Sequence, residues 1–585
     1  MTDQDDFRIR PGSGRSTRAP KTRSFVNQVL RAAKTAGHVS GSSRSRRTSG
    51  LGRSSFGRGR ISFSRSRLFS PTRRVIVKAR IVRHSGRAFR SAPMSAHLAY
   101  LTREGVQRDS AEATLFDTEN DKVDERDFAK RCHPDRHHFR FIISPEDAAD
   151  MTDLRAYTRD LVQQMEKDLG TGLDWVAVDH WNTDNPHVHL LVRGQADNGA
   201  DLVISRDYIS RGLRSRAEDL VGIELGPKPE HEIRTALKRE VTVERWTRLD
   251  QQLRFAADET GHVDLRPFAG SGADRETRRL MVGRCQHLQK MGLAHPVGPG
   301  QWVIGLEAQR TLRDLGLRGD IIKTMHKALS SRGSDRAVAD YCIDEAGAGG
   351  PIIGRLVGKG LHDELTGEAY VVIDAMDGRA HHVRLKGVEV FEHAPTLGGI
   401  VEVRRFGAPN EVRPTLVLMA RSDFDLKAQI GTTAATWLDH RLLDRRPIPL
   451  AMGGFGREVR QAMAARADYL VAEGFARRQG ASGIFQRDLL NRLRRRDLDA
   501  VASRITVETG RPFLPIETDI HVEGVYRKRL TLASGRFAMI DTGLGFQLVP
   551  WSKTIKKSLG QKVTGFVRAG GLIDWQLGCT RDLGR

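Results

Sequence analysis

Apolar and polar residues begin to alternate regularly at Arg73, and this alternation predicts a half-buried β-strand. One face of the strand is apolar, and the other carries the cations Lys78 and Arg80. The preceding residues are mostly Arg, Ser and Gly with few large apolar side chains, so they cannot bury enough surface to fold alone. The pattern therefore predicts a basic disordered tail over residues 1–72 and a folded chain after it.

Helix and strand patterns then follow one another to about residue 235. Two apolar runs, residues 173–178 and 190–192, enclose a turn rich in Asn, Asp and Pro, which predicts a β-hairpin. The other predicted elements are a helix over residues 95–104, a strand over 138–143, a capped helix beginning at Ser144 and an Arg-rich helix beginning at Ser205. This order favours an α+β fold over residues 73–235, with a mainly antiparallel sheet and helices on one face.

The second half of the chain contains segments that resemble each other, which indicates an internal duplication. Residues 288–294 are similar in sequence to residues 470–476. Each segment ends a predicted helix and precedes a turn and an apolar strand. Residues 365–374 are similarly echoed by residues 533–541, among short alternating strands. We therefore predict winged-helix-like helical modules over residues 236–350 and 426–515, and small β-barrel-like modules over residues 351–425 and 516–585.

The net charge of +23 is concentrated at one end of the chain. Residues 1–90 contain 23 Lys or Arg against three acids, a net of +20, which leaves only +3 for the other 495 residues. Such a tail attracts polyanions through counterion release, so nucleic acid is the expected partner and an anionic membrane surface is the lesser alternative. The same composition also fits a tail that only keeps the protein in solution.

The cysteine content and the hydropathy of the chain predict a cytoplasmic location. The four cysteines, Cys132, Cys285, Cys342 and Cys579, are far apart and form no close metal-ligand pair, which is typical of a reducing compartment. The first residues lack the charged-then-apolar order of a signal peptide, and no apolar run approaches the roughly 18 residues of a membrane span. We therefore expect a cytoplasmic protein with no membrane insertion.

Three histidines surround the turn of the predicted hairpin. His187 and His189 are two residues apart, so their side chains fall on the same face of a strand. If the hairpin closes between His180 and His187, these two become cross-strand neighbours about 5 Å apart at Cβ. Any one of these histidines alone would most simply be structural. Three neutral imidazoles at this spacing, however, form a divalent-metal site with open positions for a ligand.

A metal site beside a positive tail suggests chemistry on a phosphodiester, whose developing charge a metal ion neutralises. The residues that would carry this chemistry resemble a known family. His180, the HVH run at 187–189 and the segment 96–103 (AHLAYLTR) match motifs of the conjugative relaxases, or mobilisation nucleases. This histidine-hydrophobic-histidine class nicks transfer origins and T-DNA borders. The resemblance covers roughly residues 73–235, which it identifies as a relaxase nuclease domain with the palm fold, and the C-terminal half resembles the long accessory region of one branch.

The resemblance also implies a tyrosine nucleophile, which would be Tyr100. In that family a tyrosine attacks the phosphate and leaves a 5′-phosphotyrosine and a free 3′-hydroxyl, and the ester retains the energy needed for rejoining. Tyr157 lies on the apolar stripe of its helix, and Tyr208 follows a helix cap and can pack beneath the sheet. The remaining tyrosines lie beyond the nuclease region. Lys78, Arg80 and Arg103 are the candidate DNA-binding residues of this region.

One departure from the family concerns the acid that would orient a histidine or assist Tyr100. Many relatives carry Asp two residues after the first His, whereas this chain has Asn182 there. Asp179 and Asp184 are the candidate supporting acids, and a turn-forming role is the alternative for each. His97, His137 and His138 are expected at surface or strand positions. The relatives work with Mg or Mn, and three histidines also suit Zn.

The leading hypothesis is therefore a metal-dependent bacterial relaxase that nicks and rejoins one DNA strand at the origin of transfer of a plasmid or integrative element. The family implies single-stranded or supercoiled origin DNA, relaxosome accessory proteins, a coupling protein and a type IV secretion system as partners. A rolling-circle replication initiator or a transposase would use the same chemistry. A basic nucleic-acid-binding protein with a structural metal site is the non-enzymatic alternative, but such sites usually have four protein ligands.

Overall fold

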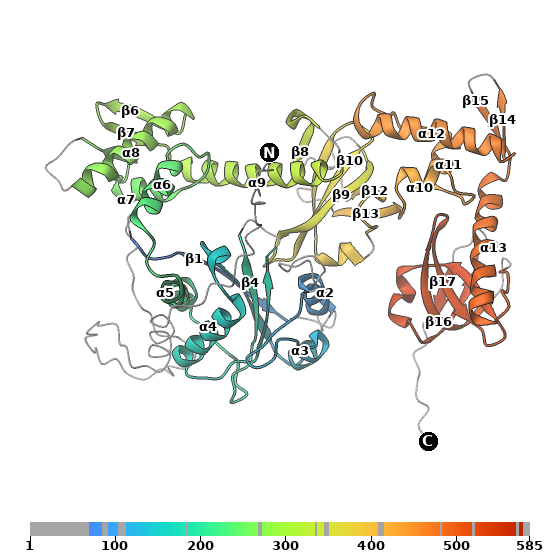
Figure 1. Cartoon of the computed structure of the whole chain (residues 1–585), viewed down its shortest axis with the longest axis horizontal. Helices are drawn as coiled ribbons and strands as arrows, with labels where there is room; N and C mark the ends of the chain where they lie inside the picture. Colours follow the sequence, from blue (N-terminus) through green and yellow to red (C-terminus); the bar gives the residue numbers. More distant parts are fainter. Residues whose placement is uncertain are drawn as a thin grey trace, which may run out of the picture. The chain divides into compact units, whose positions relative to one another are not determined.

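The computed structural model describes residues 70–84, 92–102, 113–181, 185–266, 272–333, 336–343, 350–392, 394–407, 415–479, 482–516, 521–568 and 573–576 (Figure 1). Most of the predicted basic tail therefore lies outside the described residues. The chain divides into two compact units, Met1–Gly316 and Leu317–Arg585. Among the described helices, none combines the length and the apolar character needed to cross a membrane.

The first unit is built on a four-stranded antiparallel sheet with the strand order β1-β2-β4-β3. Its strands are β1 (Val75–Arg83), β2 (His137–Pro145), β3 (Trp175–His180) and β4 (His187–Arg193). The predicted hairpin is present as β3 and β4, and its register places His180 opposite His187. The α+β class and the antiparallel sheet predicted from the sequence are thus confirmed for this region.

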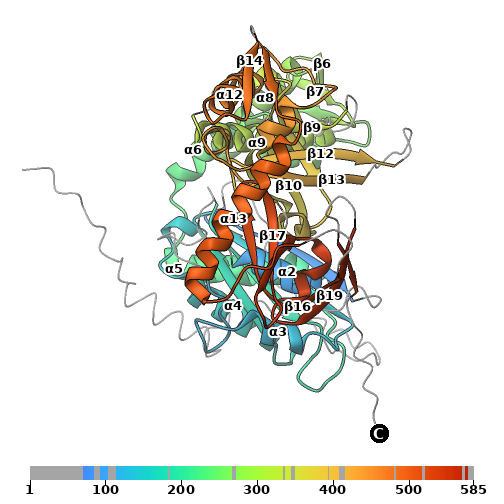
Figure 2. The ribbon, with the colours of Figure 1, turned by 90° about the vertical axis from the view of Figure 1, so that its right-hand side faces the viewer.

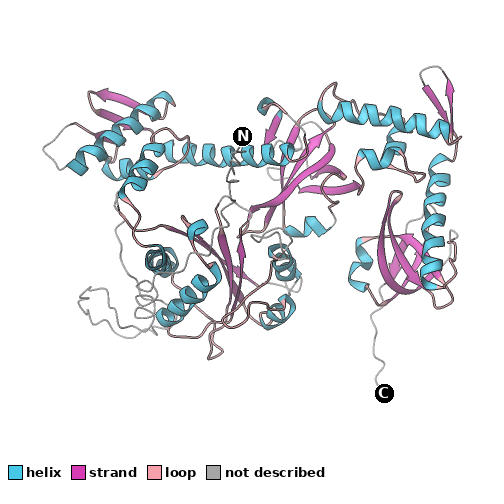
Figure 3. Ribbon diagram, viewed as in Figure 1, coloured by secondary structure: helices cyan, strands magenta, loops and turns pink. Residues whose placement is uncertain are grey.

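Helices cover both faces of this sheet, so the prediction of helices on one face is wrong (Figure 3). One face packs against α4 (Leu154–Leu169) and α5 (Leu213–Leu225), which follows the π-helical turn η3 (Tyr208–Gly212). The other face, over β3 and β4, packs against α2 (Ala92–Leu101) and α3 (Glu125–Arg131). The reason is that β3 and β4 are apolar on both sides, as in the consecutive buried residues Val176, Ala177 and Val178.

The helix expected to have its N-cap at Ser144 begins nine residues later. Strand β2 continues through Pro145 because it remains paired with β1, and the short 3-10 turn η2 (Ala148–Asp150) follows. Asp153 is the actual N-cap of α4, since its carboxylate accepts hydrogen bonds from the backbone N–H groups of Arg155 and Ala156. Sheet pairing therefore overrides the capping signal at Ser144.

The rest of the first unit is mainly helical. It contains α6 (Glu230–Glu240), α7 (Arg248–Ala256) and α8 (Gly272–Lys290), with a small sheet of β5 (His262–Asp264), β6 (Ala294–Gly298) and β7 (Gln301–Ile304). Helix α9 (Ala308–Ser330) contains the boundary between the two units.

The second unit holds two mainly antiparallel sheets joined by helices. The first has the order β13-β12-β9-β10-β11-β8, and the second has the order β18-β17-β16-β19-β20. The strands of the first sheet are β8 (Tyr341–Ile343), β9 (Ile352–Asp363), β10 (Glu368–Ala375), β11 (Ala380–Leu385), β12 (Ile400–Phe406) and β13 (Thr415–Ser422). Those of the second are β16 (His521–Leu532), β17 (Gly535–Asp541), β18 (Phe546–Pro550), β19 (Lys562–Val567) and β20 (Ile573–Gln576).

Neither sheet closes into a barrel within the described residues, so the expectation of β-barrel-like modules is wrong. Closure requires hydrogen bonds between the two edge strands. In the first sheet one edge strand is the three-residue β8, which pairs in parallel with β11, and β13 at the opposite edge pairs with β12. The sequence pattern indicated short alternating strands correctly, but alternation does not encode whether a sheet closes.

Between the two sheets lie α10 (Leu426–Ile430), α11 (Trp437–Leu442), α12 (Gly454–Ala472) and α13 (Leu489–Thr509), with the hairpin of β14 (Ala476–Gln479) and β15 (Ser482–Phe485) between α12 and α13. Helix α13 runs from this hairpin toward β16 and β17 in both ribbon views (Figures 1 and 2).

A buried ion pair occurs at the same place in both helical parts of the chain. Arg284 of α8 binds Asp250 of α7, and Arg466 of α12 binds Asp439 of α11, with an Nε to Oδ1 distance of 2.8 Å in each pair. All four side chains are buried, and each aspartate also closes the capping box of its own helix. A β-hairpin and a long helix follow in both cases, β6–β7 with α9 and β14–β15 with α13.

The two sheets of the second unit repeat a second contact. A Cβ on Gly354 would overlap the carbonyl oxygen of Asp374, and a Cβ on Gly524 would overlap that of Asp541. The carboxylate of each of these aspartates accepts hydrogen bonds from two arginine side chains. These repeated contacts support the internal duplication that the sequence indicated, because each repeat combines helices, a hairpin, a long helix and a sheet.

Candidate metal centre

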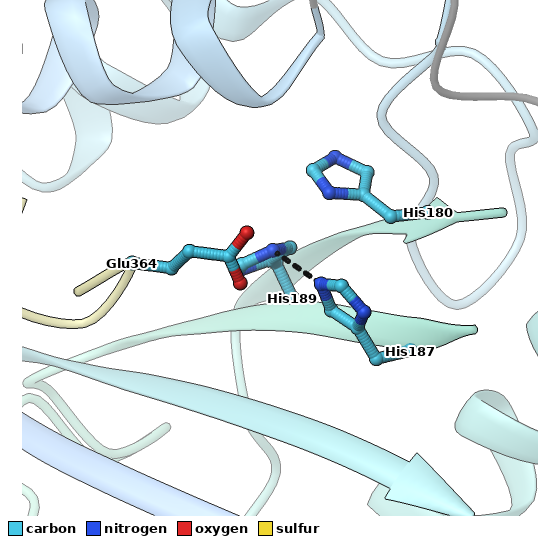
Figure 4. A group of neighbouring side chains, drawn as sticks. All are labelled: His180, His187, His189 and Glu364. Carbon is cyan, nitrogen blue, oxygen red and sulfur yellow. Dashed lines mark hydrogen bonds between the residues drawn. The ribbon is translucent and has the colours of Figure 1, made fainter. Parts of the chain in front are cut away.

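Three buried histidines meet on one side of the β3–β4 hairpin (Figure 4). His180 lies opposite His187, and His189 lies opposite Val178, so the pleat directs all three imidazoles to the same face. The ring centroids are 4.6 to 5.4 Å apart. One ring nitrogen of each histidine lies within 4.8 Å of the others. The structure therefore brings together the three predicted metal ligands.

The spacing of two of the ring nitrogens fits a single ion. His187 Nε2 and His189 Nε2 are 3.2 Å apart. Two nitrogens at this separation, each about 2.1 Å from one metal ion, subtend an angle of about 100° at the ion. That angle lies between the ideal values of octahedral and tetrahedral coordination, so both geometries are accessible with a small adjustment of either ring.

Backbone carbonyls orient two of the three imidazoles. His180 Nε2 lies 2.8 Å from the carbonyl oxygen of Leu101, and His187 Nδ1 lies 3.0 Å from that of Asn185. A carbonyl oxygen accepts a hydrogen bond only from a protonated nitrogen, so the lone pairs are on His180 Nδ1 and His187 Nε2. Metal-binding histidines almost always donate their second N–H in this way. The three residues can therefore hold a divalent metal ion, whose identity they do not fix.

Asp179 is not placed to support this centre. It lies on the opposite face of β3, where its neighbour in the register is Val188. Its carboxylate accepts hydrogen bonds from Arg155 Nε at 3.0 Å and from Trp181 Nε1 at 2.7 Å. The proposed role as a supporting acid is therefore wrong for Asp179, and the alternation of side chains along β3 was the signal that excluded it. Asp184, the other candidate acid, lies outside the described residues.

Helix α2 reaches the histidine cluster with its last residue. Its buried face is formed by Met94, His97, Leu98 and Leu101, and the carbonyl oxygen of Leu101 is the one that contacts His180. Tyr100, the predicted nucleophile, is half-buried and packs against the apolar cluster of which Leu98 and Leu101 are part. The backbone of the residue next to Tyr100 thus contacts a metal-ligand candidate.

His97 is buried on a helix, contrary to the surface or strand position expected for it. It lies four residues before Leu101, so it falls on the face of α2 that packs against the domain. The spacing of His97 with Leu98 and Leu101 was the signal that would have predicted this burial.

The alternative tyrosines lie on the other face of the sheet, in the core formed with α4 and α5. Tyr157 is buried and its hydroxyl donates to the carbonyl oxygen of Ala217 at 3.2 Å. Tyr208 is also buried, and its hydroxyl donates to the Asp168 carboxylate at 3.1 Å. Burial and the adjacent carboxylate raise the pKa of Tyr208 far above its ordinary value, which suits a structural residue and not a nucleophile.

Lys78 and Arg80 lie on the histidine-bearing face of the sheet, and both are exposed. Lys78 pairs with Ile142 of β2, which in turn pairs with His189 of β4. Neighbouring strands are about 4.8 Å apart, so the backbone of Lys78 is about 10 Å from that of His189. Arg103, the third candidate DNA-binding residue, lies outside the described residues.

His84, just after β1, and the buried His138 of β2 belong to a separate hydrogen-bonded network. His84 Nε2 lies 2.7 Å from His138 Nδ1, and Arg140 Nε donates to His138 Nε2 at 3.0 Å. Burial, with the nearby Arg140, lowers the pKa of His138 to about 2, so its ring stays neutral. His138 pairs with Arg193, six residues along β4 from His187, so it lies about 20 Å from the start of that strand. It therefore takes no part in the cluster.

Residues 281–416 and 411–584 match a family model described as "Protein of unknown function (DUF3363)". The two stretches together span just over half of the chain, and neither includes the sheet that carries the histidines. No curated protein and no solved structure matches the chain.

Proposed function

We propose that this chain, which belongs to the DUF3363 family, is a metal-dependent DNA nicking and rejoining enzyme of the relaxase type. In this proposal it acts on one strand at the origin of transfer of a plasmid or integrative element and so initiates conjugative transfer. The observation that carries the proposal is the contact between the histidine cluster and α2. The Leu101 carbonyl lies 2.8 Å from His180 Nε2, and the predicted nucleophile Tyr100 is the preceding residue.

The histidines and Tyr100 have separate roles in the proposed reaction. A divalent ion held by His180, His187 and His189 would neutralise charge on the non-bridging oxygens of the scissile phosphate. The Tyr100 oxygen forms a bond to phosphorus, and the bond from phosphorus to the 3′ oxygen breaks. The phenolic proton leaves to water, and the departing 3′ oxygen takes up a proton. Attack by that 3′-hydroxyl reverses the reaction and rejoins the strand.

The cationic side of β1 supports a nucleic-acid substrate. Lys78 and Arg80 are exposed on the face that carries the imidazoles, about two strand spacings from His189. Phosphates bound there would lie along a path that leads to the histidine cluster. A cytoplasmic location, relaxosome accessory proteins, a coupling protein and a type IV secretion system belong to the same proposal, as what the relaxase resemblance implies.

Covalent capture tests the proposal. The full-length protein is incubated with Mn²⁺ or Mg²⁺ and origin-containing single-stranded DNA, and the adduct is resolved by denaturing electrophoresis. We expect an adduct with the unchanged protein and none with Tyr100→Phe or His187→Ala. Tyr157→Phe is the matched control, because Tyr157 lies on the opposite face and should leave the adduct intact.

An adduct that persists in Tyr100→Phe would exclude Tyr100 as the nucleophile, and the absence of any adduct with metal and origin DNA would refute the enzymatic proposal. Sequencing the DNA attached to Tyr100 distinguishes a transfer origin from a replication origin or a transposon end. A protein that binds metal and DNA but never cuts would support the non-enzymatic alternative.

A further inference from the structure

The two repeats of the C-terminal half differ in charge at one equivalent surface. In the second repeat, residues 477–496 cover the β14–β15 hairpin and the first two turns of α13 and contain seven arginines and one acid, Asp488. The equivalent stretch of the first repeat, residues 295–315, contains two arginines and two acids. The same fold therefore forms with a neutral surface, so the six excess positive charges of the second repeat are not required for folding.

Arginines at the start of α13 lie beside the β14–β15 hairpin and its own arginines. Arg492 and Arg496 each place their guanidinium carbon over the ring of Phe475, at 5.5 and 5.2 Å from its centroid. Phe475 is the residue just before β14, whose first positions include Arg477 and Arg478. Cation–π contacts thus hold the start of α13 beside the hairpin. We name this surface the arginine face; it consists of Arg477, Arg478, Arg487, Arg492, Arg494, Arg495 and Arg496.

Few of these charges are neutralised within the chain. Among the described residues, Arg478 pairs with Asp468 at 2.7 Å and Arg496 approaches Glu473 at 3.7 Å. No described carboxylate lies within ion-pair distance of the other five. Nearly all seven side chains are exposed, and only Arg494 is half-buried. Like charges packed this closely repel one another, and a bound polyanion removes that repulsion while releasing its own counterions.

The chemistry of the arginine face indicates which polyanion it fits. All seven cations are arginine, whose planar fork matches the oxygens of a phosphate group in a bidentate geometry. Residues 489–496 alone rise about 11 Å along the axis of α13, which is enough to meet several phosphates of one duplex. We infer that the arginine face binds the phosphate backbone of duplex nucleic acid without reading its sequence. This site is separate from the histidine cluster and does not depend on the nicking chemistry proposed above.

The equivalent helix of the first repeat provides the control for a test by mutation. The full-length protein carries Arg487→Gln, Arg494→Gln and Arg495→Gln together, and a second variant carries Arg310→Gln, Arg313→Gln and Arg318→Gln in α9. Both variants lose three charges at exposed or half-exposed positions, and an unchanged melting temperature confirms that each is folded. Binding to a duplex of arbitrary sequence is measured by fluorescence anisotropy without metal at several salt concentrations.

If each of the three arginines contacts a phosphate, the slope of log K against log salt falls by about 2.7 in the first variant, at about 0.9 per contact. We expect a change of less than about 1 in the α9 variant. Equal changes in both variants would show a simple net-charge effect and overturn the inference, as would no change in either.

A local measurement excludes a contribution from the basic N-terminal segment. Phenylglyoxal modifies accessible arginines, and mass spectrometry reads the modification at each position. We expect duplex DNA to protect Arg487, Arg494 and Arg495 but not Arg310 and Arg313. Protection by phosphatidylglycerol vesicles and not by DNA would assign the arginine face to a membrane surface and refute the inference. Unprotected arginines in both cases would also refute it.

Discussion

Binding of a divalent metal should stabilise the β3–β4 hairpin selectively. The hairpin carries all three ligand candidates, and their ring nitrogens lie within 4.8 Å of one another only while β3 and β4 remain paired. An ion that binds the folded hairpin and not the opened one lowers the population of the opened state by a factor of 1 plus the ratio of metal concentration to Kd. At a concentration of 100 times Kd this factor is about 100, or about 2.7 kcal/mol.

Amide hydrogen exchange measures this effect locally. Peptides from β3 and β4 should exchange about 100-fold more slowly with metal than without it, in the limit in which exchange follows opening of the hairpin. Peptides from the sheet of β16 and β17 should be unaffected, because they contain no ligand. His187→Ala removes one of the two nitrogens that are 3.2 Å apart and should abolish the protection, whereas Tyr100→Phe should preserve it.

Two results would refute the reasoning. Equal protection by metal in His187→Ala would show that the ion binds elsewhere, for instance to other histidines. Absence of protection in the unchanged protein at millimolar Mn²⁺, Mg²⁺ or Zn²⁺ would show that the three imidazoles form a structural cluster. In the second case the proposed nicking centre would lack the metal ion that is proposed to neutralise charge on the scissile phosphate.

Three further predictions concern stability and reactivity. Arg466→Met should destabilise the second unit by about 3–5 kcal/mol in chemical denaturation, because it leaves the fully buried Asp439 carboxylate without its ion-pair partner. Adding Asp439→Asn should restore part of that loss, because it removes the buried charge and keeps an oxygen that can accept the hydrogen bonds from Thr436. Gly354→Ala should lower the melting temperature, since the added Cβ overlaps a backbone carbonyl that cannot move without breaking the sheet, and an unchanged melting temperature would contradict the stated packing. Burial raises the pKa of Cys132 and of Cys285 to about 12, so iodoacetamide at pH 8 should label both slowly until denaturant is added. Because the folded state favours the protonated thiols, their contribution to the stability of the fold is complete below the ordinary pKa near 9. This contribution is lost as the pH rises toward 12.

Several features of the histidine site followed from local sequence. The two-residue spacing of His187 and His189 placed both rings on one face, and the apolar runs on either side of the turn predicted the hairpin that sets His180 opposite His187. The same alternation places Asp179 on the far face, although proximity to His180 in the sequence suggested a supporting role. When a feature depends only on how side chains alternate along one strand, the sequence alone predicts it.

Other features depended on contacts between distant segments. The Leu101 carbonyl that orients His180 lies 79 residues away in the chain, and no local pattern encodes that contact. The start of α4 at Leu154 depended on the pairing of Pro145 with Val75, which prolonged β2 past a strong capping signal.

The sequence by itself therefore determined the α+β class, the histidine hairpin and the echo between the two C-terminal repeats, because each depends on the periodicity of one segment or on direct comparison of two. The tertiary structure decided which helix supplies a carbonyl to the histidine cluster and that helices cover both faces of the first sheet. It also decided that the sheets of the second unit stay open within the described residues. These features depend on the free energy of packing elements that are far apart in the chain, which is a property of the whole fold and not of any one segment.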